Sequence, residues 1–419
     1  MKDHAAADSN YVAPRVATRS PRRSKEDRPL GIDARAGRAL HWLRTEARAL
    51  EDPVPVIDGL CVRLAEDGFP LAWLQCGFPT LHPQIAGCAF TWKRPTQAME
   101  TCVLHGDTGA HGPVHDLAAA AEPRRLGPDA VARLVPSAQL PERAERRDWI
   151  QLPLLFSGGR RHSLLVAGET GRKFSPTELT ALDWIGGMVA PVLESLMTRR
   201  VARTLLETYV GPRAGGRILD GRIQRGDVEE IEAALWFSDL RDSTRLAETL
   251  SSVELLATLN AFFEHIAGAV TAHGGEVLRF VGDGMLVVFP SRGSGLTGAC
   301  RRGAAAADDA IGGLAALNAR AEVPATVRFG IGLHVGAAIY GNVGAPDRLD
   351  FTVHGSAVNR AARIESMTKR LGTPVLASAE FAALCGHRTR AIGRYQLKGI
   401  TEAVTLYELL VPPAGELVS

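Results

Sequence analysis

Two acidic residues that lie far apart in the sequence each follow a run of residues typical of a buried strand. Asp239 comes soon after the apolar run 233–237, and Asp283 is the middle residue of a Gly-Asp-Gly turn between the strand-like runs 276–281 and 285–289. Two carboxylates brought together at strand ends repel each other unless cations hold them, and oxygen ligands of this type suit Mg²⁺ or Mn²⁺, which in turn bridge phosphates. An Asp in such a turn is equally a common turn residue, so the pair alone leaves a metal site and ordinary turn chemistry open.

Amide and cationic side chains recur further along the chain, in positions suited to hold a nucleotide. Asn359 and Arg363 are four residues apart in a predicted helix over 356–370, so they share one face of it. Such a pair could orient a ribose and grip a phosphoryl group, although a solvated helix face has the same composition. Lys398, in a Leu-Lys-Gly sequence after a predicted strand, could meet a triphosphate. Each residue alone has an ordinary explanation, and the specific signal is the order of all of them.

The C-terminal half of the chain has the strand and helix order that would bring these residues to one sheet. A capping box, Ser251-x-x-Glu254, starts a helix with an apolar stripe, and an Ala-rich helix is expected over about 296–320. With strands at 233–237, 276–281, 285–289 and 327–335, the order is β-α-β-β-α-β, which predicts an α+β, ferredoxin-like palm. In such a palm the end of the first strand and the 282–284 hairpin lie side by side, so the two acids should be neighbours.

The segment 233–409 resembles the catalytic domain of class III adenylate/guanylate cyclases, and its motifs occur in family order. These motifs are FSDLRDST (237–244), LRFVGDGMLVVF (278–289), VGAAIYGNVG (335–344), FTVHGSAVNRAAR (351–363) and LKG (397–399). The resemblance implies that Asp239 and Asp283 hold two Mg²⁺ or Mn²⁺ ions. It also implies that Asn359 orients the ribose, that Arg363 contacts the phosphoryl group and that Lys398 binds the triphosphate.

The family also implies a reaction and an assembly. The 3′-hydroxyl of ATP would attack the α-phosphate in line, pyrophosphate would leave, and 3′,5′-cyclic AMP would form, so the protein would be a lyase. The turn that contains Leu240, Arg241, Ser243 and Thr244 leads into a helix, so its backbone N–H groups are expected to meet the β- and γ-phosphates. The resemblance further implies a homodimer with two shared sites, in which the aspartates come from one chain and the Asn and Arg from the other.

Four positions depart from the family pattern. Arg279 stands four residues before the second Asp, where an adenine-contacting Lys is usual, and Thr352 stands seven before the Asn, a choice that still implies adenine. Asp242 occupies a position where Gly is frequent, and it either adds negative charge near the triphosphate or caps a helix. Ala337 replaces a phosphate-contacting Arg of some members. An adenylate cyclase is therefore the first hypothesis, and a guanylate cyclase or a catalytically silent nucleotide-binding sensor are the alternatives.

Residues 31–197 are predicted to form a separate α/β domain. Amphipathic helices are expected at 38–50 and 55–65, and the apolar runs 149–156 and 162–167 around a Ser-Gly-Gly-Arg turn predict a β-hairpin. Ser175-Pro176-Thr177-Glu178 predicts a capped helix that runs to about 209. A hairpin followed by a long exit helix resembles the C-terminal half of a GAF-type sensor domain, which implies a regulatory role and leaves room for a small-molecule ligand. Trp73, Trp92 and Trp149 are interpreted as core, with a sensor pocket as the alternative.

The remaining segments are interpreted as connections. Residues 198–230 are expected to be a helical linker and a Gly- and Arg-rich connection before the catalytic domain at 231–412, and residues 1–30 and 413–419 to be tails, the first of them disordered. Cys102, His105, His111 and His115 lie in a Gly-rich stretch that is interpreted as a polar loop, with a metal site as the alternative.

Composition narrows the choice of partners and compartment. Lys and Arg number 48 against 46 Asp and Glu, a net charge of +2, and aromatic residues are 6% of the chain, which argues against nucleic acid as the main partner. Six scattered cysteines without a CxxC pair argue against a disulfide scaffold and favour reduced thiols in a cytoplasmic protein. No run of about 18 apolar residues is present, so no membrane span is expected.

Overall fold

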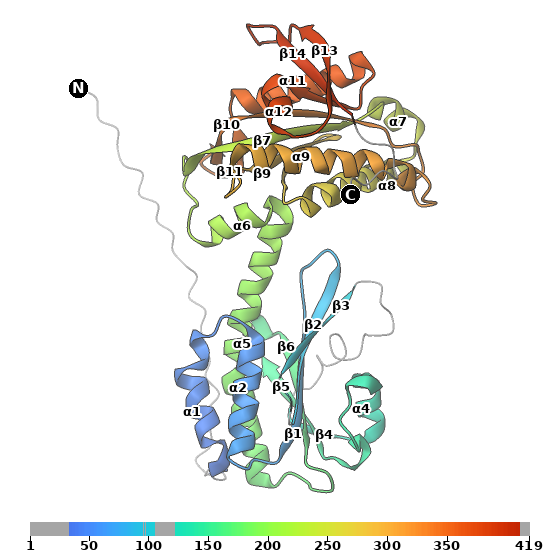
Figure 1. The fold of residues 1–419 in the computed structure, drawn as a ribbon. Coiled ribbons are helices and arrows are strands. Elements are labelled where there is room, and N and C mark those ends of the chain that lie inside the picture. Colours follow the sequence, from blue (N-terminus) through green and yellow to red (C-terminus); the bar gives the residue numbers. More distant parts are fainter. Residues whose placement is uncertain (1–32, 95, 97, 105–121, 411–419) are drawn as a thin grey trace, which may run out of the picture. The chain divides into compact units, whose positions relative to one another are not determined.

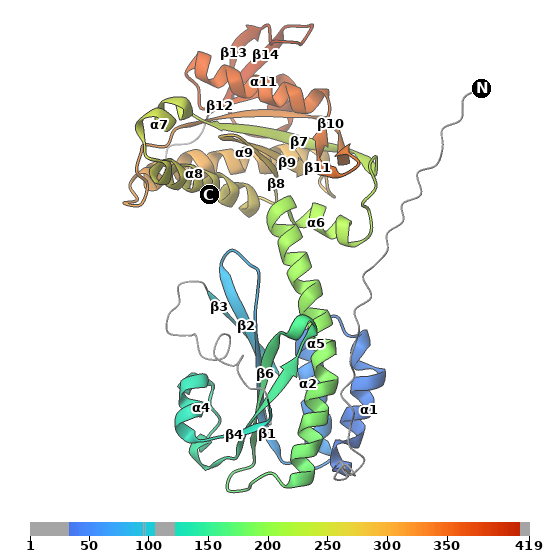
Figure 2. The same ribbon diagram turned by 180° about the vertical axis from the view of Figure 1, so that it is seen from behind.

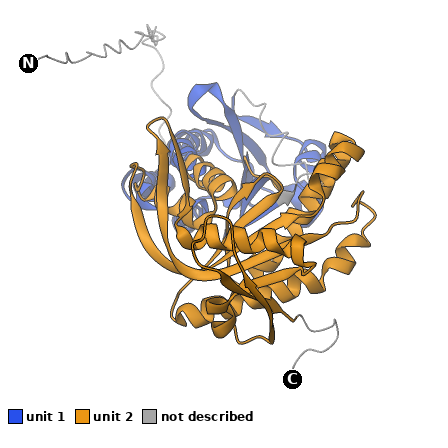
Figure 3. Ribbon diagram, turned by 90° about the horizontal axis from the view of Figure 1, so that it is seen from above, with its two compact units in different colours: residues 1–79, 86–197 blue, residues 80–85, 198–419 orange. Residues whose placement is uncertain are grey.

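The chain divides into two compact units, which are described separately. The structure, a computed structural model, describes residues 33–94, 96, 98–104 and 122–410. The first unit comprises residues 1–79 and 86–197, and the second comprises residues 80–85 and 198–419 (Figure 3). The two predicted tails lie outside the described residues, as do His105, His111 and His115.

A six-stranded sheet forms the centre of the N-terminal unit. Its strand order is β3-β2-β1-β6-β5-β4. Helices α1, α2 and α5 cover one face and α4 covers the other (Figures 1 and 2). The elements are α1 (Gly37–Thr45), α2 (Pro53–Glu66), β1 (Leu71–Pro79), β2 (Ile85–Lys93), β3 (Met99–Leu104), β4 (Arg124–Leu126), α4 (Pro128–Leu134), β5 (Trp149–Leu155), β6 (Arg161–Gly168) and α5 (Pro176–Val210).

The predicted hairpin of this unit is confirmed, and its tryptophans form part of the core. Strands β5 and β6 pair antiparallel, with Trp149 opposite Ala167. The Trp73 and Trp149 rings meet edge to face with centroids 5.0 Å apart, and both side chains are buried under α4. Trp92 is buried as well. The nearly continuous burial along β5 and β6 therefore fills both faces of the sheet, as expected for a sheet covered on both sides.

Helix α5 begins at the predicted capping box and ends where Val210-Gly211-Pro212 interrupts it. The Ser175 N–H donates to Glu178 Oε2 at 2.8 Å, and the Glu178 N–H donates to Ser175 Oγ at 3.3 Å. Glu178 is also fully buried and accepts bonds from Arg35 Nη2 at 2.5 Å and from Arg172 Nη2 at 2.6 Å. The capping carboxylate thus also joins three separate segments of the unit.

A second helix, α6 (Pro212–Leu219), stands where we expected an irregular Gly- and Arg-rich connection. Pro212 occupies its first turn, where a missing N–H costs nothing. A Cβ added to Gly215 would lie 3.0 Å from the backbone nitrogen of Glu207, so this glycine lets α6 pack closely on the end of α5. The composition suggested a loop because it does not distinguish a flexible glycine from one required by close packing.

The predicted palm is confirmed in the C-terminal unit. Strands β10, β7, β9 and β8 are neighbours in that order, within an eight-stranded sheet. Its elements are β7 (Val228–Leu240), α7 (Ser243–Thr249), α8 (Ser252–Ala272), β8 (Glu276–Val281), β9 (Gly284–Pro290), α9 (Gly295–Gly312), α10 (Leu314–Asn318), β10 (Phe329–Ala345), β11 (Arg348–His354), α11 (Ser356–Leu371), β12 (Val375–Ser378), α12 (Ala379–Leu384), β13 (Thr389–Tyr395) and β14 (Val404–Leu409).

Helices cover both faces of this sheet. Ala234 and Trp236 of β7 pack into one cluster with residues of α8, α9 and α12, whereas Ile231 and Leu235 pack into a second cluster with residues of α6 and α11. Figures 1 and 2 show α8 and α9 on the opposite side of the sheet from α11. The period of two along β7 therefore supplies both cores from one strand.

Two elements differ in length from the sequence prediction. Strand β7 starts at Val228 instead of 233, because its first residues alternate Glu with Ile and pair with the far end of β10. An apolar run identifies only the fully buried half of such a strand. The helix predicted over 296–320 is divided into α9 and α10 at Gly313, where a Cβ would lie 2.7 Å from the His265 ring.

Glycines in β10 allow α11 to pack directly on the sheet. A Cβ on Gly332 would lie 2.2 Å from the backbone nitrogen of Glu365 and 2.5 Å from the Ala361 carbonyl oxygen. A Cβ on Gly330 would meet Thr368 Oγ1 at 2.2 Å. No larger residue fits at either position without displacing the helix, so these two glycines fix the position of α11 against β10.

Two expectations drawn from composition change with the structure. Helices α5 and α8 are long and apolar enough to cross a membrane by length and composition alone, although their apolar residues include core positions such as Leu182 and Phe262. Cys88 and Cys102 form a disulfide, so the expectation of reduced thiols is wrong for this pair. The other four cysteines, Cys61, Cys76, Cys300 and Cys385, are free and buried.

Candidate active site

The two acids singled out in the sequence lie at adjoining ends of β7 and β9. Strand pairing places Asp239 opposite Gly284, the residue next to Asp283, and the Leu240 N–H donates to the Asp283 carbonyl at 3.2 Å. A Cβ on Gly284 would lie 2.9 Å from Asp239 Oδ1, so the Asp239 carboxylate lies over that glycine. The Gly-Asp-Gly turn therefore brings the backbone of one predicted ligand next to the side chain of the other.

Burial and like charge both act against ionisation of Asp239. Burial raises the pKa of Asp239 to about 6, the Asp283 carboxylate adds to this shift, and Arg241 and Lys369 oppose it. A carboxyl whose ionised form is disfavoured in this way gains free energy when a cation binds beside it. The local electrostatics therefore favour a positive ligand at this end of the sheet.

Glu365 of α11 is a third acid at this end, and the sequence analysis missed it. Its side chain is buried, and Glu365 Oε1 and Arg241 Nη2 lie 2.9 and 2.8 Å from the same point, the Cβ position of Gly330. Burial raises the pKa of Glu365 to about 7, and the charge of Asp239 contributes. The signal available in the sequence was the spacing, because Glu365 shares a helix face with the small residue Ala361 four positions earlier and with Thr368 three positions later.

A cavity of about 530 Å³ lies beside these residues. It is lined by residues 239–245 and by Glu248, Glu365, Ser366 and Lys369. All of the predicted binding residues of the β7–α7 turn, including Ser243 and Thr244, therefore border one space. Its lining includes the acids Asp239 and Glu365 and the cations Arg241 and Lys369, a combination suited to a metal-bound polyphosphate.

The turn offers fewer backbone donors than the sequence suggested. The N–H groups of Leu240 and Arg241 already donate to the carbonyls of Asp283 and Arg328, at 3.2 and 2.7 Å. The expectation that these two N–H groups meet phosphates is therefore wrong. Ser243 and Thr244 begin α7, where N–H groups lack partners within the helix, so the role remains possible for them alone.

The backbone of Asp242 adopts a conformation that glycine favours. Its backbone has φ 59 and ψ 25, the left-handed conformation that glycine adopts without strain. Asp242 occupies the N-cap position of α7, as the helix-cap interpretation expected, but its side chain makes no cap hydrogen bond. Instead, its carboxylate pairs with Arg328 at 2.5 Å and with Lys369 at 3.7 Å. The extra negative charge next to the cavity is thereby balanced within the chain.

The predicted phosphate-binding cations lie on another side of α11. Arg363 and Lys398 line a second cavity, of about 680 Å³, together with Arg370 and residues 396–401. Asn359 and Arg363 are both exposed on α11, which is also what the alternative interpretation as a solvated helix face expects. Ser366 borders this cavity and the Asp239 cavity alike. Within one chain, Asp239 therefore borders one cavity, and Arg363 and Lys398 border another. The two cavities share helix α11.

The two predicted base-recognition residues lie near a third cavity, of about 750 Å³. Arg279 of β8 lines it and forms an ion pair with Asp350 of β11 at 2.6 Å. Thr352 is two residues beyond Asp350 on the same strand and is buried. The sequence analysis missed Asp350, because its partner lies 71 positions earlier and neither residue belongs to a periodic pattern. The pair directs the guanidinium of Arg279 toward β11.

The residues present fit a divalent metal. Asp239 and Asp283 supply carboxylate oxygens, the ligand type that Mg²⁺ and Mn²⁺ prefer. Burial and the charge of Asp283 raise the pKa of Asp239, and a bound cation would offset both effects by stabilising the ionised carboxylate. The donor set and its electrostatics agree on the same class of ion.

Comparison with known proteins places the second unit beside cyclase catalytic domains. Residues 228–410 match the family model described as the adenylate and guanylate cyclase catalytic domain. "Adenylate cyclase 1" of Rhizobium meliloti (strain 1021) is 33% identical over 186 residues, which are 43% of this chain and 27% of that protein. The chain spans 27–42% of the length of the first curated relatives that it matches.

Solved structures of both cyclase types are similar to this chain. A bacterial light-regulated adenylyl cyclase is 26% identical, with a TM-score of 0.38 over 43% of this chain and 91% of the other. The guanylyl cyclase Cya2 is 28% identical, with a TM-score of 0.39 over 43% and 92% of the two chains. With the family match, the motifs and the palm together, residues 228–410 are a catalytic domain of the class III adenylate/guanylate cyclase family.

Proposed function

We propose that the protein is an adenylate cyclase that converts ATP to 3′,5′-cyclic AMP and pyrophosphate and that acts as a homodimer. The observation that carries the proposal is the distribution of the motif residues. Asp239 and its neighbours line one cavity, and Arg363 and Lys398 line another on a different side of α11. Two copies related by a two-fold axis would complete two equivalent sites, each combining the acids of one copy with the cations of its partner.

Each side chain has a role that follows from its chemistry. Asp239 and Asp283 would hold Mg²⁺ or Mn²⁺, ions that supply charge neutralisation for the phosphates and lower the pKa of a bound hydroxyl. Arg363 would contact the α-phosphate through its planar, permanently charged guanidinium, and Asn359 would hold the ribose through its amide. Lys398 would bind the terminal phosphates as a point charge. This chemistry consists mostly of positioning and charge stabilisation, which these residues supply.

Product analysis with a mixture of two inactive variants tests both parts of the proposal. Purified wild type, Asp239→Ala and Asn359→Ala are incubated with ATP or GTP and Mn²⁺, and the products are separated by chromatography. Each variant alone should make almost no cyclic nucleotide. An equimolar mixture that re-equilibrates should recover up to about a quarter of wild-type activity, because half of the dimers are mixed and each has one intact site.

A matched control separates shared sites from simple mixing. Asp239→Ala mixed with Asp283→Ala should stay inactive, because both changes damage the same half of the site. Recovery in this control, or none in the first mixture, would contradict sharing between chains. Wild type that binds metal–ATP but makes no cyclic nucleotide would contradict the enzyme and favour a catalytically silent nucleotide-binding sensor.

A guanylate cyclase is the second candidate. Arg279 replaces the usual adenine-contacting Lys, and its ion pair with Asp350 leaves a carboxylate and a guanidinium beside Thr352. A carboxylate accepts from the N1–H and amino group of guanine, whereas adenine offers only its amino group. Competition between ATP and GTP distinguishes the two, since the preferred nucleotide should have the higher kcat/KM. Asp350→Ala should lower kcat/KM for GTP only if this candidate is right.

The N-terminal unit is proposed to be a GAF-like regulatory domain that binds a small molecule, in a cytoplasmic protein. The support is the β5–β6 hairpin followed by the long helix α5, which runs on into the connection before the catalytic domain. A screen of metabolites for a change in the melting temperature of the full chain, followed by cyclase assays with each hit, tests this role. A ligand that stabilises the protein but leaves the turnover unchanged would speak against regulation.

A further inference from the structure

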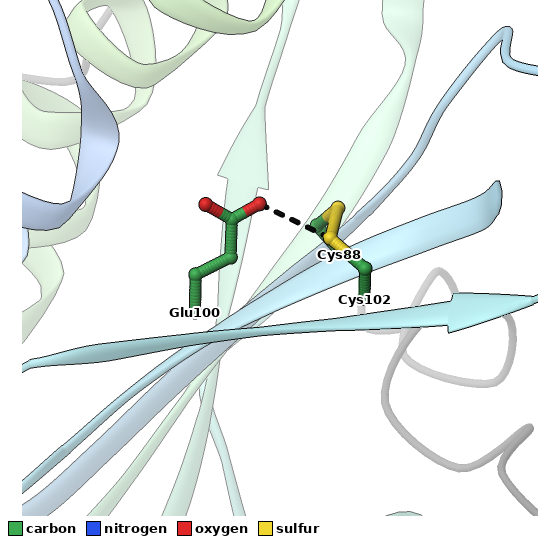
Figure 4. Close-up of side chains that lie close together, drawn as sticks. All are labelled: Cys88, Glu100 and Cys102. Atoms are coloured by element: carbon green, nitrogen blue, oxygen red, sulfur yellow. Dashed lines mark hydrogen bonds between the residues drawn. A yellow bond between two sulfur atoms is a disulfide. The ribbon is translucent and has the colours of Figure 1, made fainter. Parts of the chain in front are cut away.

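One pair of cysteines in the N-terminal unit differs from all the others. Cys88 of β2 and Cys102 of β3 form a disulfide with Cα atoms 4.2 Å apart, and β3 is the edge strand of its sheet. Cys88 is buried and Cys102 is exposed. Of the six cysteines, Cys102 is thus the one exposed residue, and its partner lies on the neighbouring strand (Figure 4).

The remaining cysteines are protected from the same chemistry. Cys61, Cys76, Cys300 and Cys385 are buried, and burial raises the pKa of each thiol. A thiol reacts as its thiolate, so these four groups are both inaccessible and poorly ionised. An oxidant of the small-disulfide class therefore meets one reactive sulfur in this chain, that of Cys102.

A carboxylate lies next to the pair. Glu100 Oε1 is 3.2 Å from Cys102 Sγ (Figure 4). This contact is a hydrogen bond only when Cys102 is a thiol, since a disulfide sulfur has no hydrogen to donate. The same geometry thus accommodates two states: a disulfide, and a dithiol in which the Cys102 S–H donates to Glu100. The hydrogen bond exists only in the reduced state and therefore stabilises that state.

We propose that Cys88 and Cys102 are a reversible thiol–disulfide exchange site whose substrates are small thiols and disulfides of the glutathione class. The Cys102 thiolate attacks one sulfur of the small disulfide, a mixed disulfide forms at Cys102, and one small thiol leaves. Cys88 is buried from external disulfides, but its sulfur lies within bonding reach of the Cys102 sulfur, so its thiolate attacks that sulfur and expels the second small thiol. In total, one protein dithiol and one small disulfide give one protein disulfide and two small thiols, a two-electron exchange.

The experiment is a redox titration of the full chain. Protein is equilibrated in buffers of reduced and oxidised glutathione, quenched with acid, unfolded and alkylated, and the cysteines are mapped by mass spectrometry. Cys88 and Cys102 should become protected from alkylation together, with a two-electron midpoint, while the other four remain alkylated throughout. A pair that stays reduced, or is still disulfide-bonded at the most reducing ratio, would overturn the proposal.

Variants assign the two roles. Cys88→Ser should stop at a mixed disulfide on Cys102, because no second sulfur resolves it. Cys102→Ser should leave Cys88 unmodified, because Cys88 is buried. Cys61→Ala, which removes a buried cysteine of the same unit, is the matched control and should titrate like wild type. A mixed disulfide at Cys88 in Cys102→Ser would overturn the order of attack, and melting curves of all variants establish that they are folded.

Glu100 provides a surface variant that keeps both cysteines. Glu100→Ala removes the acceptor of the thiol hydrogen bond, so it should shift the equilibrium toward the disulfide by about fivefold, the equivalent of one ordinary hydrogen bond. No shift, or a shift toward the dithiol, would overturn the part assigned to Glu100.

The same three residues could instead bind a metal, because their ligand atoms lie within 4.8 Å of one another. Zinc titration of the reduced protein decides this. Wild type, Cys88→Ser and Cys102→Ser should bind Zn²⁺ equally weakly. One equivalent of Zn²⁺ bound tightly by the wild type alone, with protection from oxidation, would overturn the exchange site in favour of a metal site.

Discussion

Glu178 of the N-terminal unit and Glu365 of the C-terminal unit are both buried acids near arginine, yet their pKa values shift in opposite directions. Burial alone would raise the pKa of Glu178, but hydrogen bonds from the Ser175 N–H, Arg172 and Arg35 outweigh it, and the pKa falls below its usual 4.5. Burial raises the pKa of Glu365 to about 7, Asp239 adds to the rise, and Arg241 only partly opposes it.

The difference lies in the balance of charges around each group. Glu178 has two cationic partners and serves as a structural clamp. Glu365 shares one half-buried guanidinium, that of Arg241, with Asp239, and Asp283 adds a further negative charge. An excess of acids that weakens the folded state is typical of a site that binds a cation or a reacting group. The comparison therefore distinguishes an acid that holds the fold from acids that serve a ligand.

The largest expected effect separates activity from stability at Asp239. Asp239→Ala should lower cyclase activity by about 100-fold or more, because a metal ligand is lost. It should leave the melting temperature of the metal-free protein unchanged or raised, because a disfavoured charge is removed. Asp309→Ala, which removes an exposed acid paired with His273, is the control and should keep its activity. A large loss of stability in Asp239→Ala would place this residue with Glu178 instead.

The second prediction concerns Glu178 and its two arginine partners, Arg35 and Arg172. Glu178→Gln should cost the N-terminal unit about 2 kcal/mol in free energy of unfolding, since two arginines lose their charged partner and a buried network loses hydrogen bonds. Denaturant titration measures the loss. Glu169→Gln, which weakens an exposed pair with Arg94, should change the free energy of unfolding by less than about 0.5 kcal/mol. Equal effects of the two variants would mean that the burial of Glu178 adds nothing.

The two units should respond to pH in opposite directions. The stabilisation from Glu178 is complete above its usual pKa of 4.5 and is lost as the pH falls through its lower folded value. Glu365 and Asp239 have raised pKa values, so the stability linked to them is greatest at low pH and is lost as the pH rises toward about 7 and about 6.

Peptide-resolved hydrogen exchange on metal-free protein, corrected for the intrinsic pH dependence of exchange, checks this prediction. Between pH 7 and pH 5, peptides of β7 and α11 should gain protection, while peptides of α5 should not change. Glu365→Gln should reduce the gain. If protection of both units falls together from pH 7 to pH 5, the proposed difference between the two acids does not exist.

The smallest expected effect is at Asp242. Arg328→Ala removes the nearer partner and leaves Asp242 with Lys369 at 3.7 Å alone, so its negative charge beside the cavity is less well balanced and KM for the nucleotide should rise about threefold, as expected for a surface ion pair. Steady-state kinetics measure the change. Asp242→Gly alone should alter KM little, and the double variant should restore the wild-type value. An additive double variant would show that the two side chains act independently.

The sequence was a good guide wherever a pattern reflects local chemistry. The capping boxes at Ser175 and Ser251 and the apolar runs of β8 and β9 predicted elements that the structure contains. The convergence of Asp239 and Asp283 followed from the palm order alone. Arg363 and Lys398 were identified by motif, and their roles remain predictions.

What the sequence did not reveal depends on contacts between distant segments. Glu365 is a site acid only because Gly330 and Gly332 bring α11 onto β10, and Asp350 matters only because β11 brings it to Arg279. The Cys88–Cys102 bond depends on the pairing of β2 with β3, which spacing does not encode. The occupied N–H groups of Leu240 and Arg241 likewise depend on neighbouring strands and loops.

The close contact between α11 and Gly332 of β10 has a consequence for how the helix can move. At Gly332 the backbone of the helix contacts the strand with no side chain between them, and Ser366 borders two separate cavities. In the proposed dimer, those spaces belong to two different reaction chambers. A small tilt of one α11 would then change the shape of both active sites together. The activities of the two sites would therefore rise and fall together.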